Sequence, residues 1–255
     1  MGDMAEIECT LVLNEVFIVQ KAVGRGKTAH VHYAIYKDEC DIALKEFRFG
    51  RLSDKILMDF HKELETLKKL NHDNICRLLG HYIDRDSKQL YLAFEWLPCG
   101  CLYDVIHDKE VSIEYMDVLE MSIDIARGMK YLHSQHIIHR DLKSHNLLLD
   151  EAYRVKITDF GTAKSLEKIS GTAYTEVGTG GYMAPEVIEP PIQGYDRKVD
   201  IFSYGVLLWE IYERKGIFDQ RCLRNMSQLR QGVRPKISEN CPIKFKQLIQ
   251  FTTLY

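Results

Sequence analysis

The fold is decided by the stretch His139-Arg140-Asp141-Leu142-Lys143-Ser144-His145-Asn146-Leu147-Leu148-Leu149. Asp159-Phe160-Gly161 begins thirteen residues after Asn146, and Ala184-Pro185-Glu186 lies further along the chain. A single Asp or Asn in a loop is usually a turn former. Several polar motifs in this fixed order instead indicate that distant parts of the chain contribute to one site.

A glycine-rich turn lies near the N-terminus, in Val23-Gly24-Arg25-Gly26-Lys27-Thr28-Ala29-His30-Val31. Glycine lets backbone amides approach phosphate oxygens closely and tolerates positive φ. Gly26-Lys27-Thr28 imitates the end of a P-loop, but Lys21 stands where that motif needs its first glycine, and no helix is predicted after the turn. We therefore interpret the turn as a strand–turn–strand lid with Ala29 in place of a third glycine; a plain structural hairpin is the alternative.

A strand that carries a lysine follows this turn, in Ile42-Ala43-Leu44-Lys45. Alternation along a strand puts Ala43 and Lys45 on one face. The next predicted element is a helix with two acids, Glu63 and Glu65, which lie about 200° apart around the helix. Only one of these acids can face the sheet. We expect Glu63 to fix the ammonium group of Lys45, with Glu65 as the rival.

Hydrophobic patterning makes the first part of the chain rich in strands. β-Branched and aromatic residues predict strands over residues 16–23, 31–36, 42–47 and 89–94. Apolar residues three and four apart predict one helix over residues 53–70. The buried face of this helix is expected to carry Ile56, Leu57, Phe60, Leu64, Leu67 and Leu70.

Beyond Pro98 and Gly100 the pattern becomes helical. Ser112 is the expected N-cap of a long helix, and a second apolar helix is predicted over residues 200–212. One side of the long helix is expected to carry Met116, Leu119, Ile123, Ala126, Met129 and Leu132. Segregation of sheet and helices defines the α+β class. We expect a leader of residues 1–15, a small lobe of residues 16–96 and a larger lobe of residues 97–255.

Composition excludes several classes of protein. The 34 basic and 37 acidic residues give a net charge of −3, which provides no electrostatic footprint for nucleic acid or an anionic membrane. Runs without Asp, Glu, Lys or Arg reach only about nine residues, as in 201–209, whereas a membrane helix needs about 20. Seven scattered cysteines are typical of reduced intracellular thiols. We expect a cytoplasmic protein with no nucleic-acid partner and no membrane insertion.

Together the motifs resemble those of a eukaryotic-type protein kinase domain, over about residues 16–255. Lys143 and Thr179 match the serine/threonine members, and the motifs are most similar to the tyrosine-kinase-like group. The resemblance implies a bilobal fold, with one helix in a small antiparallel-sheet lobe and a larger helical lobe. It also implies transfer of the γ-phosphate of Mg-ATP to serine or threonine hydroxyls of protein substrates.

The resemblance assigns a role to each motif. Asp141 is expected to accept the proton of the incoming hydroxyl, Lys143 to neutralise the transferred phosphate, and Lys45 to hold the α- and β-phosphates. Asn146 and Asp159 offer oxygen ligands that suit Mg²⁺. We expect these groups to meet around Mg-ATP. The expected nucleotide-binding set is Val23, Gly24, Arg25, Gly26, Lys27, Thr28, Ala29, His30, Val31, Ala43, Lys45, Phe94, Glu95, Leu97 and Leu148.

The resemblance also implies regulation by phosphorylation. Arg140, which precedes the expected base, is implied to pair with a phosphate on the activation segment and to order it. Thr175 stands at the expected place, four residues before Thr179, with Thr172 and Tyr174 as rivals. The phosphate is expected from an upstream kinase or from autophosphorylation.

The sequence departs from the family pattern at Ala29 and at its C-terminal end. The chain stops at Tyr255, so we expect the last helices of the family to be truncated. The arginine that pairs with Glu186 in the family is missing, and Arg234 lies too early to replace it. Glu186 is therefore expected to be solvated, paired with another cation, or part of an incomplete domain.

Two rival functions are weighed against the kinase function. One is a kinase-like scaffold that binds nucleotide and transfers little or no phosphate. The other is a small-molecule phosphotransferase, which the Ala184-Pro185-Glu186 segment disfavours because it resembles a platform for protein substrates.

Overall fold

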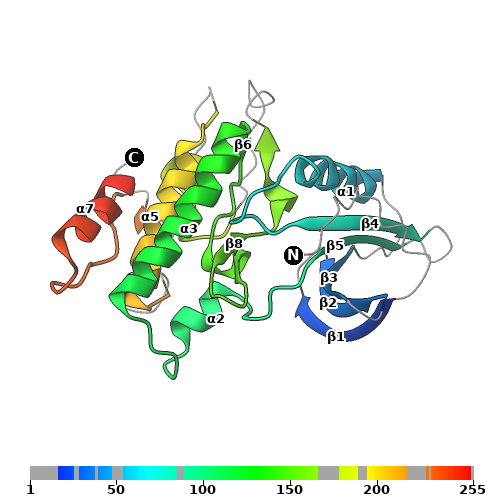
Figure 1. Cartoon of the computed structure of the whole chain (residues 1–255). Coiled ribbons are helices and arrows are strands. Elements are labelled where there is room, and N and C mark those ends of the chain that lie inside the picture. The colour runs from blue at the N-terminus through cyan, green and yellow to red at the C-terminus, as the bar shows by residue number, and fades with distance from the viewer. Residues whose placement is uncertain are drawn as a thin grey trace. The chain divides into compact units, whose positions relative to one another are not determined.

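A computed structural model describes residues 17–25, 29–37, 40–47, 54–84, 89–165, 178–188, 194–216, 228–229 and 231–253. The chain divides into two compact units, Met1–Pro98 and Cys99–Tyr255 (Figure 1). We call them the first and the second unit and describe each by itself.

The first unit is built on an antiparallel sheet of five strands in the order β1-β2-β3-β5-β4. The strands are β1 (Phe17–Arg25), β2 (Ala29–Tyr36), β3 (Cys40–Phe47), β4 (Leu78–Asp84) and β5 (Gln89–Glu95). Strand β4 was not predicted from the sequence. Its pairing with β5 shifts register between Leu78 and Gly80, and such an irregularity interrupts the apolar alternation that reveals a strand.

Lys45 on β3 and α1 (Asp54–Leu67), the only helix described in the first unit, lie on the same face of this sheet. The register pairs Val31 with Lys45 and Ala43 with Phe94. Helix α1 packs beside them, because the rings of Phe47 and Phe60 meet edge to face at 5.3 Å. The predicted helix face is confirmed at Phe60, Leu64, Leu67 and Leu70, which are buried, whereas Leu57 is half-buried and the side chain of Ile56 lies outside the described residues.

The second unit is mainly helical. It contains α2 (Leu102–His107), α3 (Tyr115–Ser134), α4 (Pro185–Ile188), α5 (Lys198–Glu213) and α7 (Ile243–Thr252). Helices α3 and α5 lie side by side, and α7 packs against α5 (Figure 1). Two small sheets pair β6 (Ile137–Ile138) with β9 (Lys164–Ser165) and β7 (Leu147–Leu149) with β8 (Val155–Ile157). The short 3₁₀ turns are Ser144–Asn146 and Phe160–Thr162. The predicted α+β class, with a small antiparallel sheet followed by a helical part, is confirmed.

Helix α3 corrects two predictions. Its N-cap is Glu114 rather than Ser112, because Glu114 and Asp117 form a reciprocal capping box. The predicted buried side is wrong in its first half, since Met116 and Ile123 are exposed. The helix instead buries Val118, Met121, Ser122, Asp124, Ile125, Gly128, Met129 and Leu132.

Helix α5 is the central support of the second unit. It buries residues all around its circumference, as expected of a helix enclosed by other elements. Gly205 permits the close approach of α7, because an added Cβ would lie 2.4 Å from Thr252 Oγ1 and 2.6 Å from Thr253 Cγ2. Asp200 and Glu210 are buried in this otherwise apolar helix. Such buried acids need partners.

Candidate active site

Lys45 and Glu63 form a buried ion pair in the first unit. Lys45 Nζ lies 2.7 Å from Glu63 Oε1, and the Glu63 side chain is only 3% exposed. Glu65, the rival acid, is exposed and faces Lys68 at 3.4 Å instead. The geometry therefore pairs Lys45 with Glu63, which fixes the ammonium over the sheet face that also carries Val31.

The expected nucleotide-binding residues fall on both units. In the first unit, the register sets Gly24 opposite Val31 and Arg25 opposite His30. Gly24 has no positive φ, so its backbone conformation does not itself demand glycine. The remaining described members are Val23 on β1, Ala29 on β2, Ala43 on β3, Phe94 and Glu95 on β5, and Leu97 directly after it, with Leu148 on β7 of the second unit. Gly26, Lys27 and Thr28 lie outside the described residues.

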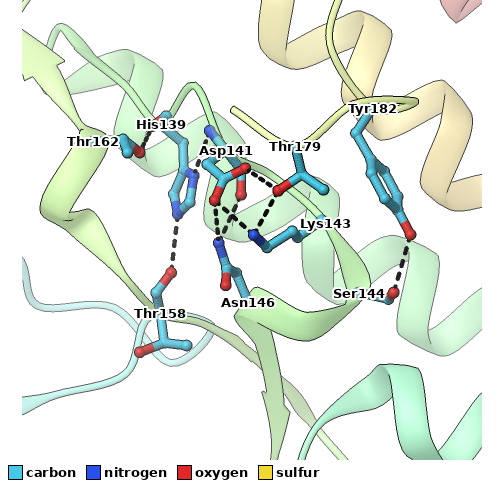
Figure 2. Close-up of polar contacts among 9 residues, drawn as sticks. All are labelled: His139, Asp141, Lys143, Ser144, Asn146, Thr158, Thr162, Thr179 and Tyr182. Carbon is cyan, nitrogen blue, oxygen red and sulfur yellow. Dashed lines mark hydrogen bonds and ion pairs between the residues drawn. The ribbon is translucent and has the colours of Figure 1, made fainter. Parts of the chain in front are cut away.

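Three side chains of the second unit form a closed triangle of hydrogen bonds (Figure 2). Lys143 Nζ lies 2.8 Å from Asp141 Oδ2 and donates to Thr179 Oγ1 at 2.6 Å. Thr179 Oγ1 donates to Asp141 Oδ1 at 2.8 Å, and Asn146 Nδ2 donates to Asp141 Oδ2 at 3.1 Å. The carboxylate of Asp141 thus accepts three hydrogen bonds, which hold both of its oxygens in place. The triangle joins the loop of residues 139–146 to the segment of residues 178–188.

His139 and Asp200 hold the start of the 139–146 loop. His139 Nε2 donates to Thr158 O at 3.0 Å, so its Nδ1 is the acceptor that faces the backbone amide of Asp141 at 3.3 Å (Figure 2). Asp200 accepts from the backbone amides of His139 and Arg140, each at 2.9 Å. The carboxylate of Asp200 on α5 therefore fixes the backbone that leads into Asp141.

Asn146 and Asp159 are brought near each other by the β7–β8 hairpin. The backbone amide of Thr158 donates to Asn146 O at 2.9 Å, and Asp159 is the next residue. Asp159 has φ 62 and ψ 75, a left-handed conformation that is costly for a side chain other than glycine. One amide and one carboxylate suit a Mg²⁺ ion that takes its other oxygen ligands from phosphates and water, so this donor set fits the metal. No group of three or more His, Cys, Asp and Glu side chains within the described residues could hold a metal alone.

Arg140 is anchored inside the second unit. Its Nε donates to Thr162 O at 2.7 Å, its Nη2 contacts the same carbonyl oxygen, and its Nη1 donates to Tyr195 Oη at 3.2 Å. Arg140 itself has φ 69. Thr175 and its rivals lie outside the described residues.

The described hydrogen bonds of Arg234 go to backbone carbonyl oxygens rather than to Glu186. Burial lowers the pKa of the Arg234 guanidinium, and the negative charge of Glu186 opposes this shift. Arg234 therefore lies within electrostatic range of Glu186 although it occurs early in the sequence. Its guanidinium hydrogen-bonds to Thr253 O and Leu229 O, each at 3.0 Å, and Glu186 is only partly buried.

Asp200 and Glu210 are the site residues that sequence reasoning missed. Glu210 accepts hydrogen bonds from Tyr182 Oη at 2.7 Å and Ser144 Oγ at 3.0 Å. The signal was present, because these acids flank the uncharged run 201–209. An acid in a helix that is apolar on all sides predicts a buried polar contact.

Comparison with known proteins agrees with this fold. Residues 17–251 match the protein kinase domain. The chain belongs to the protein kinase domain family.

Relatives from two kingdoms share this domain. "Probable serine/threonine-protein kinase drkA" of Dictyostelium discoideum is 34% identical over 233 residues, which are 89% of this chain and 35% of the relative. "Serine/threonine-protein kinase STY17" of Arabidopsis thaliana is 32% identical over 234 residues, 91% of this chain and 40% of the relative. "RGS domain-containing serine/threonine-protein kinase A" of Dictyostelium discoideum is 34% identical over 233 residues, 91% of this chain and 20% of the relative.

The chain therefore spans 35% and 40% of the length of the first two of these relatives. Along the part of the chain that is described, no helix has the length and apolar character required to cross a bilayer.

Proposed function

We propose that this chain is a serine/threonine protein kinase of the tyrosine-kinase-like group, which uses Mg-ATP to phosphorylate protein substrates. The observation that carries the proposal is the hydrogen-bonded set of Asp141, Lys143, Asn146 and Thr179. Lys143 and Thr179 support serine or threonine as the acceptor, and the names of the relatives agree. Residues 16–96 and 97–255 are proposed as the two lobes of the domain, after a leader of residues 1–15.

Asp141 is proposed to receive the proton of the substrate hydroxyl. Three hydrogen bonds orient its carboxylate, so an oxygen can be presented to an incoming hydroxyl without reorganisation. Lys143 keeps its ammonium beside this carboxylate and stabilises negative charge that develops on the transferred group. Thr179 links both residues to the segment on which a protein substrate would dock.

Asn146 and Asp159 are proposed to hold the Mg²⁺ ion. When bound, the ion would neutralise charge on the phosphate oxygens. Asn146 Nδ2 donates to Asp141 O at 2.8 Å. The oxygen of the same side-chain amide therefore points away from Asp141 O. That oxygen is a hard donor of the kind that Mg²⁺ prefers.

Lys45 is proposed to bind the α- and β-phosphates, with Glu63 as the residue that positions it. The glycine-rich turn, residues 23–31, would cover the phosphates, and Val31, Ala43 and Leu148 would enclose adenine. Phe94 would limit the pocket behind adenine, and Glu95 and Leu97 would belong to the hinge beside it. Ala29 is buried on β2, so its methyl group is accommodated within the sheet.

Arg140 is proposed to bind a phosphate group on the activation segment. A phosphate on Thr175, added by an upstream kinase or by the chain itself, would supply an anion for its guanidinium. A Thr175→Ala chain should then turn over more slowly, and unchanged turnover would remove Thr175 from the mechanism.

The test is transfer of labelled γ-phosphate from Mg-ATP to a generic serine- and threonine-rich protein, followed by phosphoamino acid analysis. We expect phosphoserine or phosphothreonine, and a rate at least about a hundredfold lower in Asp141→Asn. Label chiefly on tyrosine would contradict the acceptor class. ATP binding without transfer would instead support the kinase-like scaffold.

A further inference from the structure

A buried carboxylate on α5 receives two hydroxyl groups from different parts of the chain. Glu210 is fully buried, with Ser144 Oγ donating to its Oε1 at 3.0 Å and Tyr182 Oη donating to its Oε2 at 2.7 Å. Figure 2 shows the two hydroxyls pointing toward each other, 3.3 Å apart. Each hydroxyl has a single proton to donate, and both hydroxyls donate it to the carboxylate of Glu210.

These two hydroxyls belong to the two segments that form the Asp141 triangle. Ser144 follows Lys143 directly in the 139–146 loop, and Tyr182 lies three residues after Thr179. The backbone amide of Tyr182 also donates to Thr179 O at 3.2 Å. The carboxylate therefore ties together, at a second point, the same two segments that meet at Asp141.

A further hydrogen bond restricts how Tyr182 can move. Ser203 Oγ on α5 donates to Tyr182 O at 2.7 Å, so Tyr182 is held at both its backbone and its hydroxyl. His107 Nε2 lies 3.9 Å from Glu210 Oε1, beyond hydrogen-bond distance. His107 Nδ1 lies 2.9 Å from Tyr103 O, and a carbonyl can only accept, so the Nδ1 proton of His107 is used there.

We propose that Glu210 is a positioning residue for phosphoryl transfer. Its carboxylate holds the 178–188 segment in register with the 139–146 loop, so that the docked hydroxyl of a protein substrate faces Asp141. This inference rests on the proposed kinase function and adds a specific residue to it. Glu210 touches neither Asp141 nor a substrate; it acts through Ser144 and Tyr182.

A positioning role and general support of the fold affect different kinetic constants. Removal of one hydroxyl from the Glu210 contact should loosen the 178–188 segment, on which the protein substrate would dock. Nucleotide binding should remain, because the described contacts of Glu210 are with Ser144, Tyr182 and His107, which are not proposed nucleotide-binding residues. General loss of folded protein would instead lower kcat and leave both KM values unchanged.

The test compares Tyr182→Phe with Tyr204→Phe in the full chain. Tyr204 is the matched control, since its hydroxyl on α5 donates to Ser122 O at 3.0 Å, far in sequence from the loop. We expect Tyr182→Phe to raise KM for the protein substrate about tenfold, the size of one hydrogen bond to a charged group, with KM for ATP unchanged. Amide deuterium exchange in residues 178–188 should be faster than in Tyr204→Phe.

Ser144→Ala should also raise KM for the protein substrate. Replacement of another buried serine, Ser122→Ala, is its control. The double variant Ser144→Ala/Tyr182→Phe should lose less than the product of the single effects, because both hydroxyls act through one carboxylate.

Equal KM values in Tyr182→Phe and Tyr204→Phe would overturn the positioning role, and so would equal exchange in residues 178–188. In that case an active wild type still preserves the proposed kinase function. A wild type that transfers no phosphate would overturn both.

Discussion

Replacement of Glu210 by glutamine should change how the stability of the protein depends on pH. Burial raises the pKa of Glu210 from an ordinary value of 4.5 to about 7, although the hydrogen bonds from Tyr182 and Ser144 lower it. In the folded chain the carboxyl group of Glu210 therefore stays protonated at pH values where the same group is ionised in the unfolded chain. The contribution of Glu210 to stability is complete below pH 4.5 and is lost as pH rises through about 7.

The size of the effect follows from this difference in pKa. At about 1.36 kcal/mol for each unit, the contribution of Glu210 falls by about 2.5 kcal/mol between pH 5 and pH 8. Glutamine does not titrate. The free energy of unfolding of Glu210→Gln, minus that of the wild type, should therefore rise by about 2.5 kcal/mol across this range.

The assay is urea unfolding followed by circular dichroism at several pH values between 5 and 8. Glu213→Gln is the matched control on the same helix. Burial alone would raise the pKa of Glu213, but hydrogen bonds from Ser238 and Lys215 lower it overall. A lowered pKa contributes stability that is lost only at acid pH, so this control should stay level between pH 5 and 8. If the free energies of unfolding of the wild type and of Glu210→Gln changed with pH in parallel, the reasoning would be refuted.

Three further predictions concern other contacts. Gly205→Ala should destabilise the chain by about 1–3 kcal/mol, because the new methyl group would overlap Thr252 and Thr253; an unchanged melting temperature would contradict the tight α5–α7 contact. Asp124→Ala should cost about 1–3 kcal/mol in urea unfolding, because it leaves the buried amide of Val155 and the guanidinium of Arg154 without their acceptor. Lys45→Met should slow phosphate transfer about a hundredfold, while Lys68→Met, which removes only the exposed pair with Glu65, should not; equal rates would exclude a special role for the Lys45–Glu63 pair.

Local patterns predicted much of the fold. The helix face that contains Phe60, Leu64 and Leu67 follows from spacing alone, because one buried side of an amphipathic helix is a local property. The same reasoning failed for α3, where both sides carry apolar residues. Met116 and Ile123 fit the spacing of one side, but packing against α5 and β8 buries the side with Ile125.

The polar contacts of the site could be predicted only in part. The motifs named Asp141, Lys143 and Asn146, and Glu63 was expected as the partner of Lys45 with Glu65 as its rival, but no local pattern revealed what Glu210 would bind. The partners of Glu210 lie 28 and 66 residues away in sequence, and those of Asp200 lie 60, 61 and 67 residues away. Such pairings arise from tertiary packing, so a single sequence indicates only that a buried acid needs a partner.

The two acids of α5 explain how an irregular loop can be held accurately. Ten residues separate Asp200 from Glu210, which corresponds to about 15 Å along a helix. Asp200 holds the amides of His139 and Arg140, and Glu210 holds the hydroxyl of Ser144. The loop between these points includes the left-handed backbone of Arg140, which is unfavourable on its own. Since both anchors belong to one rigid helix, the spacing of the loop is set by α5, and a change within α5 should alter phosphate transfer without touching Asp141.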